Sequence, residues 1–544
     1  MDYSLSTLNH KALYELKSVF ISYWDDKYKL EQARILLEDG LMLFKQFKPL
    51  FMTCWIDETR ERSLNRLIHG HVFIHFMISA YQVSGNSEYI VKCEKLIKSY
   101  FNEISYMEHQ DTFAFHDETT SLRVDNWLKL LIYAYECLNQ DFIDLLLFHL
   151  GKNLRLLNDD KFFAGYNNHG MLQNFSLMTG SYIFTHDEAK ASMQKAMNRL
   201  NTYFSNAFTS EGIHVENSPM YHAIVLSRLT MYLHFMSIVK NCIKEELVEI
   251  QKKATQYIFC TIRENGCLLT LGDTIPNSLP LKTIDWVDDI NYPLLTDPNF
   301  LNLHELRKKE EFFIYPSTGY AYFYDKHINM YACFAASFEA EYHKHNDDLQ
   351  FIIDLDEPLM IDPASPGYQY NDPHVIYGRS YRAHNTLTVD GTDLPRKKNG
   401  KPVYITDYMK SEEKVFVNGI NKRHPGVEHK RCVNYSWKTH IFEIEDIVLS
   451  NENHEYTLCW HFAPNIELLS EGNSINIIRE KISVACLEIL SEDPFTLSTV
   501  NGQIEPYIQG FCFDEFYSPT PCAAIEIVFC NKANLEVKWI LKIF

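Results

Sequence analysis

The hydrophobic periodicity of the chain changes near residue 311, and this change divides the sequence into two kinds of structure. Before it, apolar residues recur at every third or fourth position, as in LNRLIHGHVFIHFMISAYQVSG over residues 64–85. That spacing places apolar side chains on one face of a helix, and Gly85 suits the position that follows a helix end. Because successive amphipathic helices of this length usually pack as antiparallel pairs, we expect a helical domain over residues 1–310.

After residue 311 the apolar segments become short, and many alternate with polar residues. HNTLTVDG (384–391) and THIFEIEDIVL (439–449) are examples, and turn pairs such as Asn418-Gly419 separate such segments. Many short strands without helices between them are typical of an antiparallel sandwich. The sequence therefore predicts an α+β chain whose β-sandwich domain spans residues 311–544, with the boundary in the charged run LHELRKKEEFFIYPSTG.

The balance of charge limits the partners of the chain. It carries 71 acidic residues against 51 basic ones, a formal net charge of -20. A field of this sign repels polyanions, which argues against nucleic acid as a partner. An acidic substrate would need a cleft that is locally basic.

The cysteines and the N-terminal residues give an expectation for the cellular compartment of the protein. The 13 cysteines are scattered and form no CxxC pair, which is typical of reduced thiols. The first residues show no basic segment followed by an apolar one, and no run is long enough for a membrane span. We therefore expect a cytoplasmic protein, or a periplasmic one if a leader was removed, and a homo-oligomer is one open option.

Two polar stretches in the helical part carry candidate chemistry. GYNNHGMLQN (165–174) places Asn168 and His169 between two glycines, at a bend or helix start. In EGIHVENSPMYHAIV, which begins at residue 211, the order Asn-Ser-Pro predicts a helix that starts at Pro219. Tyr221 then falls in the first turn. From these residues alone, an asparagine N-cap and an ordinary interfacial tyrosine are the simpler interpretations.

Histidines and an aspartate in the β part could bind a metal ion. His343 and His345 stand in H-x-H, a spacing that puts both on one face of a strand. Asp362 and His384 follow in later segments. Zinc accepts imidazole nitrogen and carboxylate oxygen, and three protein ligands with a fourth partner form a workable set.

Six motifs in this order resemble those of the heparinase II/III-like polysaccharide lyases. They are R-x-x-N-W-L from Arg123, N-N-H-G at 167–170, E-N-S-P-M-Y-H at 216–222, H-x-H-N-D at 343–347, L-M-I-D-P at 359–363 and A-H-N-T-L-x-V-D-G at 383–391. The resemblance implies an incomplete (α/α) toroid followed by an antiparallel β-sandwich, with the active cleft between them. It also implies β-elimination of a uronic-acid-containing polysaccharide, with a glycosaminoglycan of the heparan or heparosan type favoured. No organic cofactor is expected.

The resemblance assigns the catalytic roles to four residues. Asn168, helped by His169 and His343, would neutralise the uronate carboxylate, which stabilises the enediolate-like transition state. Tyr221 would protonate the leaving oxygen, and would also be the base when the two groups lie on the same side of the ring. His169 is the alternative base for the opposite epimer.

The resemblance also implies a structural zinc on three residues, His345, Asp362 and His384. His343 is then left for the cleft. Because residues 343 and 345 of a regular strand point the same way, this division requires a bend or bulge between them.

Further residues are implied to contact the substrate. They are Arg123, Asn126 and Trp127 on the helical side, and Arg379 and Tyr381, with Arg382, on the β side. Arginine suits a carboxylate or sulfate through bidentate pairing. Packing of Trp127 inside the helical domain is an equally good interpretation of that residue.

Three alternatives stay open at this point. The first is a lyase for alginate or another bacterial surface uronate polymer. The second is a glycoside hydrolase, which requires two opposed carboxylates, with Glu211, Glu216, Asp117 and Glu118 as the available ones. The third is a glycan-binding protein that keeps the fold without turnover.

Overall fold

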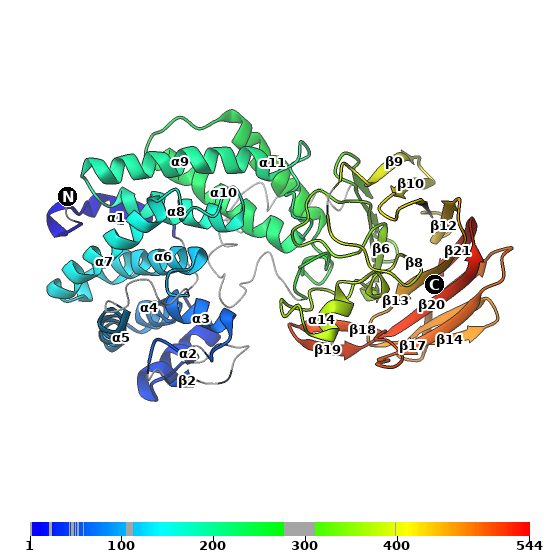
Figure 1. Cartoon of the computed structure of the whole chain (residues 1–544), viewed down its shortest axis with the longest axis horizontal. Coiled ribbons are helices and arrows are strands. Elements are labelled where there is room, and N and C mark those ends of the chain that lie inside the picture. The colour runs from blue at the N-terminus through cyan, green and yellow to red at the C-terminus, as the bar shows by residue number, and fades with distance from the viewer. Residues whose placement is uncertain are drawn as a thin grey trace. The chain divides into compact units, whose positions relative to one another are not determined.

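A computed structural model of the chain describes residues 3–20, 24–42, 44, 48, 50–51, 54–57, 59–104, 113–276, 311–397 and 399–544 (Figure 1). The described residues form two compact units: residues up to 207 with 227–248, and residues 208–226 with 249–276 and 311–544. The predicted boundary near residue 310 lies outside the described residues and stays a prediction. The predicted order, helices first and antiparallel sheets after them, is confirmed.

The first unit is helical. Its helices are α1 (His10–Leu16), α2 (Lys27–Glu38), α3 (Arg62–His69), α4 (Phe73–Ser84), α5 (Glu88–Ile104), α6 (Asp117–Ala134), α7 (Gln140–Asn158), α8 (Asn168–Tyr182) and α9 (Asp187–Ala207). The C-terminal part of α10 (Pro219–Ile238) and the first residues of α11 (Glu245–Cys260) also belong to it. Helices α6, α7, α8 and α9 pack side by side (Figure 1). None of these described helices has an apolar stretch long enough to cross a bilayer.

The segment 64–85 forms two helices where its periodicity suggests a continuous one. Helix α3 ends at His69 and α4 begins at Phe73, and His71 between them has a φ of 57°. A Cβ on Gly70 would lie 2.7 Å from the Leu122 side chain, so only glycine allows this close approach. Gly85 ends α4 in the left-handed conformation, as predicted.

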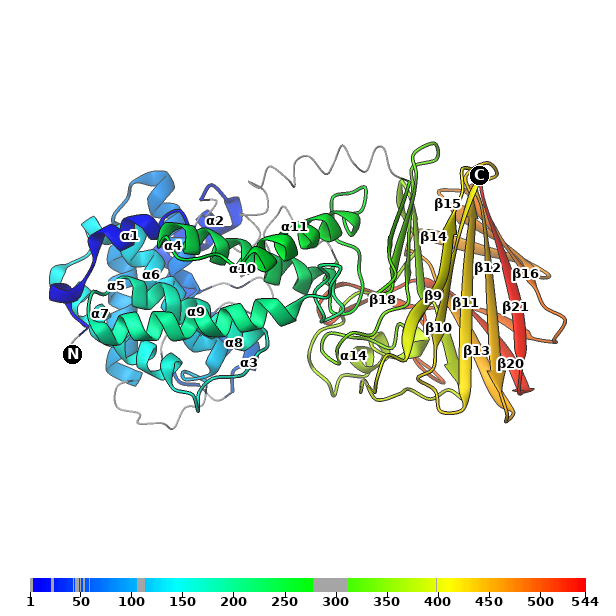
Figure 2. The same ribbon diagram turned by 90° about the horizontal axis from the view of Figure 1, so that it is seen from above.

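The second unit contains antiparallel sheets (Figure 2). A five-stranded sheet has the order β3 (Phe312–Tyr315), β4 (Tyr320–Asp325), β5 (Met330–Ala335), β6 (Gln350–Leu355) and β7 (Glu357–Met360). An eight-stranded sheet has the order β14 (Ile466–Glu471), β15 (Ser474–Arg479), β16 (Ile482–Leu490), β21 (Leu535–Ile543), β12 (Ile441–Ser450), β11 (Val427–Ser436), β10 (Lys414–Asn421) and β9 (Val403–Lys410). A four-stranded sheet has the order β17 (Thr496–Asn501), β20 (Ala523–Lys532), β13 (His454–His461) and β8 (Leu387–Val389), and β18 (Phe511–Glu515) pairs with β19 (Ser518–Pro521).

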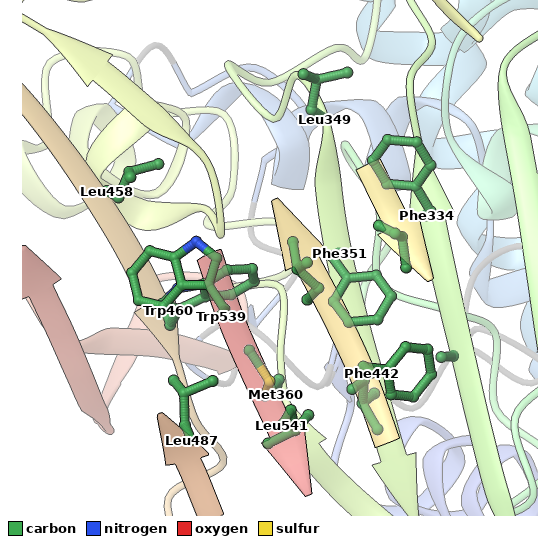
Figure 3. Packing of buried hydrophobic residues seen from close by; sticks show 14 of the residues in the cluster. Phe334, Leu349, Phe351, Met360, Phe442, Leu458, Trp460, Leu487, Trp539 and Leu541 are labelled. Carbon is green, nitrogen blue, oxygen red and sulfur yellow. The ribbon is translucent and has the colours of Figure 1, made fainter. Parts of the chain in front are cut away.

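Aromatic side chains join these sheets in one core (Figure 3). Phe442 of the eight-stranded sheet lies 5.2 Å, between ring centroids, from Phe351 of the five-stranded sheet. Trp539, also from the eight-stranded sheet, lies 5.3 Å from Trp460 of the four-stranded sheet. One face of the long sheet therefore packs against both smaller sheets, which is the sandwich arrangement.

Candidate functional site

The first cluster, in the second unit, is built around Tyr221. Helix α10 begins at Pro219, as predicted, so Tyr221 lies in its first turn. Its ring stacks on the imidazole of His343 with centroids 3.4 Å apart and an interplanar angle of 16°. The hydroxyl of Tyr221 lies 3.0 Å from the hydroxyl of Tyr368. These contacts hold a phenol in one orientation beside a second proton-carrying oxygen.

Both ring nitrogens of His343 face a carboxylate. Nδ1 lies 2.9 Å from Oδ2 of Asp273, and Nε2 lies 3.3 Å from Oε2 of Glu216. Asp273 is buried, and its Oδ1 also accepts hydrogen bonds from Nε2 of His345 at 2.9 Å and from Nη2 of Arg379 at 2.8 Å. Burial alone would raise the pKa of Asp273, but the hydrogen bonds from the two histidines and the charge of Arg379 hold it well below its usual value. Asp273 is therefore a buried anion shared by His343, His345 and Arg379, and the hydroxyl of Ser365 also donates to its Oδ1 at 3.4 Å.

The backbone around His343 is held from two sides. His343 has a φ of 55°, and its carbonyl accepts a hydrogen bond of 3.1 Å from the N–H of Asp273. A Cβ on Gly272 would lie 2.2 Å from that carbonyl oxygen, so the contact requires glycine. Asn217 donates to the carbonyl of Ala340 at 2.8 Å and so fixes the loop that leads to His343.

The two histidines of the H-x-H motif lie in the loop before β6, not in a strand as their spacing indicated. The predicted division between a zinc ligand and a cleft residue requires a bend between the two histidines. That bend is present, because His343 has a left-handed conformation. The two rings nevertheless reach the same carboxylate, Asp273, one at each oxygen. The loop thus aims two adjacent imidazoles at one anion from different directions.

The three predicted zinc ligands lie together, but their donors fit a metal only in part. Nδ1 of His345 and Nε2 of His384 are buried without a hydrogen-bond partner, and the two ring centroids are 5.4 Å apart. Asp362, in contrast, already accepts hydrogen bonds from Nδ1 of His384 at 2.9 Å and from Nε2 of Gln350 at 2.8 Å. Across the described ranges, no group of three or more His, Cys, Asp or Glu residues is arranged to hold a metal ion. Two imidazole nitrogens fit a cation, and the carboxylate orients one of them.

The second cluster, in the first unit, begins with the cap of α8. Asn167 is the N-cap, because its Oδ1 accepts from the N–H of Gly170 at 2.9 Å. Asn168, the first residue of the helix, is therefore not needed as the cap. Its Oδ1 accepts a hydrogen bond of 2.6 Å from the hydroxyl of Tyr203 on α9. Tyr203 thus fixes which way the amide of Asn168 is turned.

His169 pairs with the acidic start of α6. Its Nδ1 lies 3.2 Å from Oδ1 of Asp117, and Glu118 is paired with Arg66. Burial alone would raise the pKa of Asp117, but hydrogen bonds from His116 and His169 hold it well below its usual value. The hydrogen bond to Asp117 raises the pKa of His169. The pairing with Asp117 therefore favours the protonated imidazole of His169, and the side chain is 45% exposed to solvent.

The three predicted helical substrate contacts are buried among the helices. Arg123 donates to the carbonyls of His69 and Ala114 at 2.9 and 2.7 Å. Asn126 donates to the carbonyl of Gly70 at 2.9 Å, and the indole N–H of Trp127 bonds to Nδ1 of His71 at 3.0 Å. These bonds give all three residues a packing role, and substrate contact by them stays a prediction.

The predicted contacts on the β side also have internal partners. The hydroxyl of Tyr381 is buried and donates to Oδ2 of Asp348 at 2.8 Å. Arg382 pairs with Glu526 at 3.3 Å. Arg379 binds Asp273 and the carbonyl of Gly367, and it also lines a cavity in the second unit. Of this group, Arg379 is therefore the residue connected to the first cluster.

The carboxylates considered for a hydrolase are held by other groups. Glu211 accepts from the N–H groups of Ser317 and Thr318 at 3.1 and 2.8 Å, which ties it to the turn before β4. A hydrolase acid needs a carboxyl whose pKa is raised, whereas that of Asp117 is lowered. The described contacts favour no acid and base pair of that kind.

Two residues of the first cluster were not predicted from the sequence. Asp273 ends the run CLLTLGD, where a Gly-Asp pair after an apolar segment was the available signal. Tyr368 follows the turn-rich stretch PASPG, which marks a loop but gives no sign of its partner. Both residues are joined to their partners only by the tertiary fold.

Two protein-family models match the chain. The family model described as Heparinase II/III N-terminus matches residues 52–261, and the one described as Heparinase II/III-like, C-terminal, matches residues 307–539. No curated protein gives a significant match.

The solved structures agree with the fold. The crystal structure of heparinase III has a TM-score of 0.80 at 14% identity, over 99% of this chain and 93% of that chain. A mutant of the heparan sulfate lyase HepC from Pedobacter heparinus gives 0.70 at 13% identity, over 95% and 83%. The chondroitin AC lyase of Streptomyces coelicolor A3, in complex with chondroitin sulphate, gives 0.58 at 9% identity, over 98% and 82%. The predicted fold class, an incomplete (α/α) toroid followed by an antiparallel β-sandwich, is confirmed.

Proposed function

We propose, from the premise that this chain belongs to the heparinase II/III-like family, that it is a polysaccharide lyase acting on a uronic-acid-containing glycan. We favour a glycosaminoglycan of the heparan or heparosan type. The heparinase III structure supports that choice, because its TM-score of 0.80 exceeds the 0.58 of the chondroitin AC lyase.

The reaction sets the chemistry that the side chains must supply. A base removes the proton at C5 of the uronate, the C4–O bond breaks, and a C4=C5 double bond forms. The leaving oxygen takes a proton from an acid. Charge develops on the uronate carboxylate as C5 loses its proton, so donors aimed at that group stabilise the transition state.

The arrangement of Tyr221 is the observation that carries the proposal. Its hydroxyl has Tyr368 as a partner, and its ring is fixed by the stack on His343. Burial and then the neighbouring Tyr221 raise the pKa of Tyr368 well above its usual value, so Tyr368 keeps its proton and can donate it in a hydrogen bond to the Tyr221 oxygen. We assign to Tyr221 the proton donation to the leaving oxygen, and to Tyr368 the positioning of its hydroxyl.

The second cluster supplies groups for a carboxylate. Asn168 has an amide whose orientation is set by Tyr203, and an amide can neutralise a carboxylate by hydrogen bonding. His169 is paired with Asp117, which favours its protonated form. We therefore assign to His169 the role of a positive partner for the uronate, and keep its role as a base for the opposite epimer as the weaker alternative.

One assay tests the lyase function. The chain is incubated with heparosan, heparan sulfate, chondroitin sulfate, hyaluronan and alginate, and the ultraviolet absorbance of the unsaturated uronide is followed with the number of new reducing ends. We expect new absorbance in step with new ends, greatest with a heparan-type polymer. New reducing ends without absorbance would show hydrolysis, and an alginate-only response would move the substrate to another uronate polymer.

We further propose a structural zinc at His345 and His384, with Asp362 orienting His384. The two unpartnered imidazole nitrogens support it, and zinc would supply there a cross-link between the loop before β6 and the segment before β8. Metal content is measured after dialysis, and His384→Ala is expected to lose the zinc. An unchanged zinc content in that variant would remove His384 from the site.

A cytoplasmic location is also part of the proposal. All 13 cysteines are free thiols, which suits a reducing compartment. Cell fractionation tests it, and recovery of the chain from the periplasm would exclude it. Light scattering in solution decides between a monomer and a homo-oligomer.

A further inference from the structure

A cavity of about 210 Å³ lies in the second unit, beside α14 (Pro373–Gly378). Its lining consists of Asn346, Tyr370, Val375, Ile376, Arg379, Ser380, Asp393 and Arg396. A water molecule occupies about 30 Å³ of liquid, and whole-ligand sites are usually larger than about 300 Å³. The cavity therefore has the size of a substituent of a larger ligand.

The charged groups of the lining are the guanidinium groups of Arg379 and Arg396 and the carboxylate of Asp393. Asp393 already accepts hydrogen bonds from the N–H of Tyr381 at 2.8 Å and from Nδ2 of Asn346 at 3.2 Å. Arg396 donates to the carbonyl of Lys344 at 3.0 Å, and no ion pair of the described chain includes it. Burial and the neighbouring charge of Arg379 lower the pKa of Arg396. Arg379 and Arg396 thus both line this cavity, and among the described residues only Arg379 of the two forms an ion pair, with Asp273.

Arg379 brings a second and independent sign of a ligand. Its side chain is only 7% exposed, and its Nε is a buried donor without a hydrogen-bond partner. A buried donor without a partner on a charged group is energetically unfavourable. Arg379 also lines the cavity, so an oxygen-bearing anion bound there would lie beside its guanidinium group.

The remaining lining suits a sugar. Ile376, which is 56% exposed, offers apolar surface to the C–H groups of a ring, and Tyr370 is an aromatic side chain that is 61% exposed. The guanidinium fork matches carboxylate and sulfate geometry better than a point charge does. The cavity is thus equipped for an oxyanion carried by a ring.

We propose that this cavity is a binding subsite for an oxyanion substituent of the glycan, with Arg396 as its specificity-determining residue. Arg379 lines the same cavity and also donates to Asp273, so it connects the subsite to the first cluster. The inference rests on the proposed function, because it names the group that the glycan presents. The two sources of that group are the uronate carboxylate and a sulfate ester on a neighbouring sugar, and the test below separates them.

The test measures binding by calorimetry, so that it is independent of turnover. Two probes are used with Tyr221→Phe as the background, an unsulfated heparosan hexasaccharide and the same hexasaccharide carrying 6-O-sulfate esters. Arg396→Met removes the charge at similar length, and Lys542→Met is the matched control, because Lys542 is an exposed cation on β21 of the same unit.

Arg396→Met is expected to weaken binding about tenfold or more, about 1.4 kcal/mol per factor of ten, while Lys542→Met leaves it unchanged. An equal loss for both probes assigns the carboxylate, and a loss for the sulfated probe alone assigns the sulfate ester. Unchanged affinity for both probes overturns the proposal. If Arg396→Met does not fold, Arg396→Gln replaces it, because glutamine can still donate to the Lys344 carbonyl. The same outcomes then support or overturn the proposal.

Failure of the subsite and failure of the lyase function give different results. In a chain that retains Tyr221, Arg396→Met should raise KM about tenfold and change kcat little. Normal KM with normal turnover refutes the subsite alone. Absence of unsaturated product from every polymer, with Arg396-dependent hexasaccharide binding, refutes the lyase function and leaves the subsite standing.

Discussion

The two clusters differ in how firmly each proposed catalytic group is fixed. In the first cluster His343 lies between two carboxylates, its backbone is pinned by Asp273, and Tyr221 is stacked on its ring. In the second cluster the Asn168 amide accepts a hydrogen bond from Tyr203 at the start of α8, and His169 is nearly half exposed. The first is organised by a buried charge network, the second by the start of a helix. Proton transfer needs the stricter geometry, and binding of a carboxylate tolerates the looser one.

The largest expected effect is on turnover by the first cluster. Tyr221→Phe removes the hydroxyl and keeps the stacked ring, so we expect kcat to fall about 10²–10⁴-fold, the usual contribution of a general acid. Initial rates of unsaturated product provide the measurement. Tyr14→Phe, at a 74% exposed tyrosine, is the control. A Tyr221→Phe variant within a few fold of the original rate would contradict the assignment.

The next effect is on stability. Asp273→Asn removes the buried anion that His343, His345 and Arg379 share. Breaking a buried pair in this way costs about 3–5 kcal/mol, to be measured as the free energy of unfolding in denaturant. Asp187→Asn, at an 89% exposed side chain, should cost less than about 1 kcal/mol. Equal costs for the two variants would show that the first cluster is not held by its charges.

A smaller effect is expected for the amide of the second cluster. Asn168→Ala should lower kcat about 10²–10³-fold, as removal of one oxyanion donor does. Tyr203→Phe keeps the amide and removes only the bond that orients it, so its loss should be about tenfold or less. If Tyr203→Phe costs as much as Asn168→Ala, the orientation of the amide, and not its presence, is limiting.

The smallest effect concerns the charge of His169. Its folded pKa is raised by Asp117, so its contribution to stability is complete below the unfolded value of about 6.5 and is lost as pH rises through the raised pKa. The difference in unfolding free energy between the original chain and His169→Gln should therefore shrink from pH 6 to pH 9. Because the group is 45% exposed, the change should stay under about 1 kcal/mol. A difference that grows with pH would contradict the pairing.

Local signals predicted part of this structure well. The change of hydrophobic period separated helices from strands, and Asn-Ser-Pro located the start of α10 at Pro219. Such signals act within a few residues. Asp273 is 70 residues from His343, and Tyr368 is 147 residues from Tyr221. Contacts over such separations depend on packing, which a single sequence does not reveal.

Tertiary packing also explains why the surroundings of some residues differ from expectation. Arg123 and Trp127 belong to a motif, but motif spacing does not tell a side chain that lines a surface from one buried against its neighbours. H-x-H indicated a strand because its period is two, while the turn at His343 is imposed by Gly272 and Asn217. Period predicts local conformation only where tertiary contacts do not override it.

The two oxygens of Asp273 give the molecule a mechanical property. One oxygen holds His343, beside the reacting phenol, and the other holds His345. A rigid carboxylate cannot shift at one oxygen and stay still at the other. Any displacement of His345 therefore also moves His343 and the ring of Tyr221 stacked on it. If the zinc proposed at His345 and His384 is removed by a chelator, we expect turnover to fall because His343 and Tyr221 lose their alignment, without any contact between the metal and the sugar.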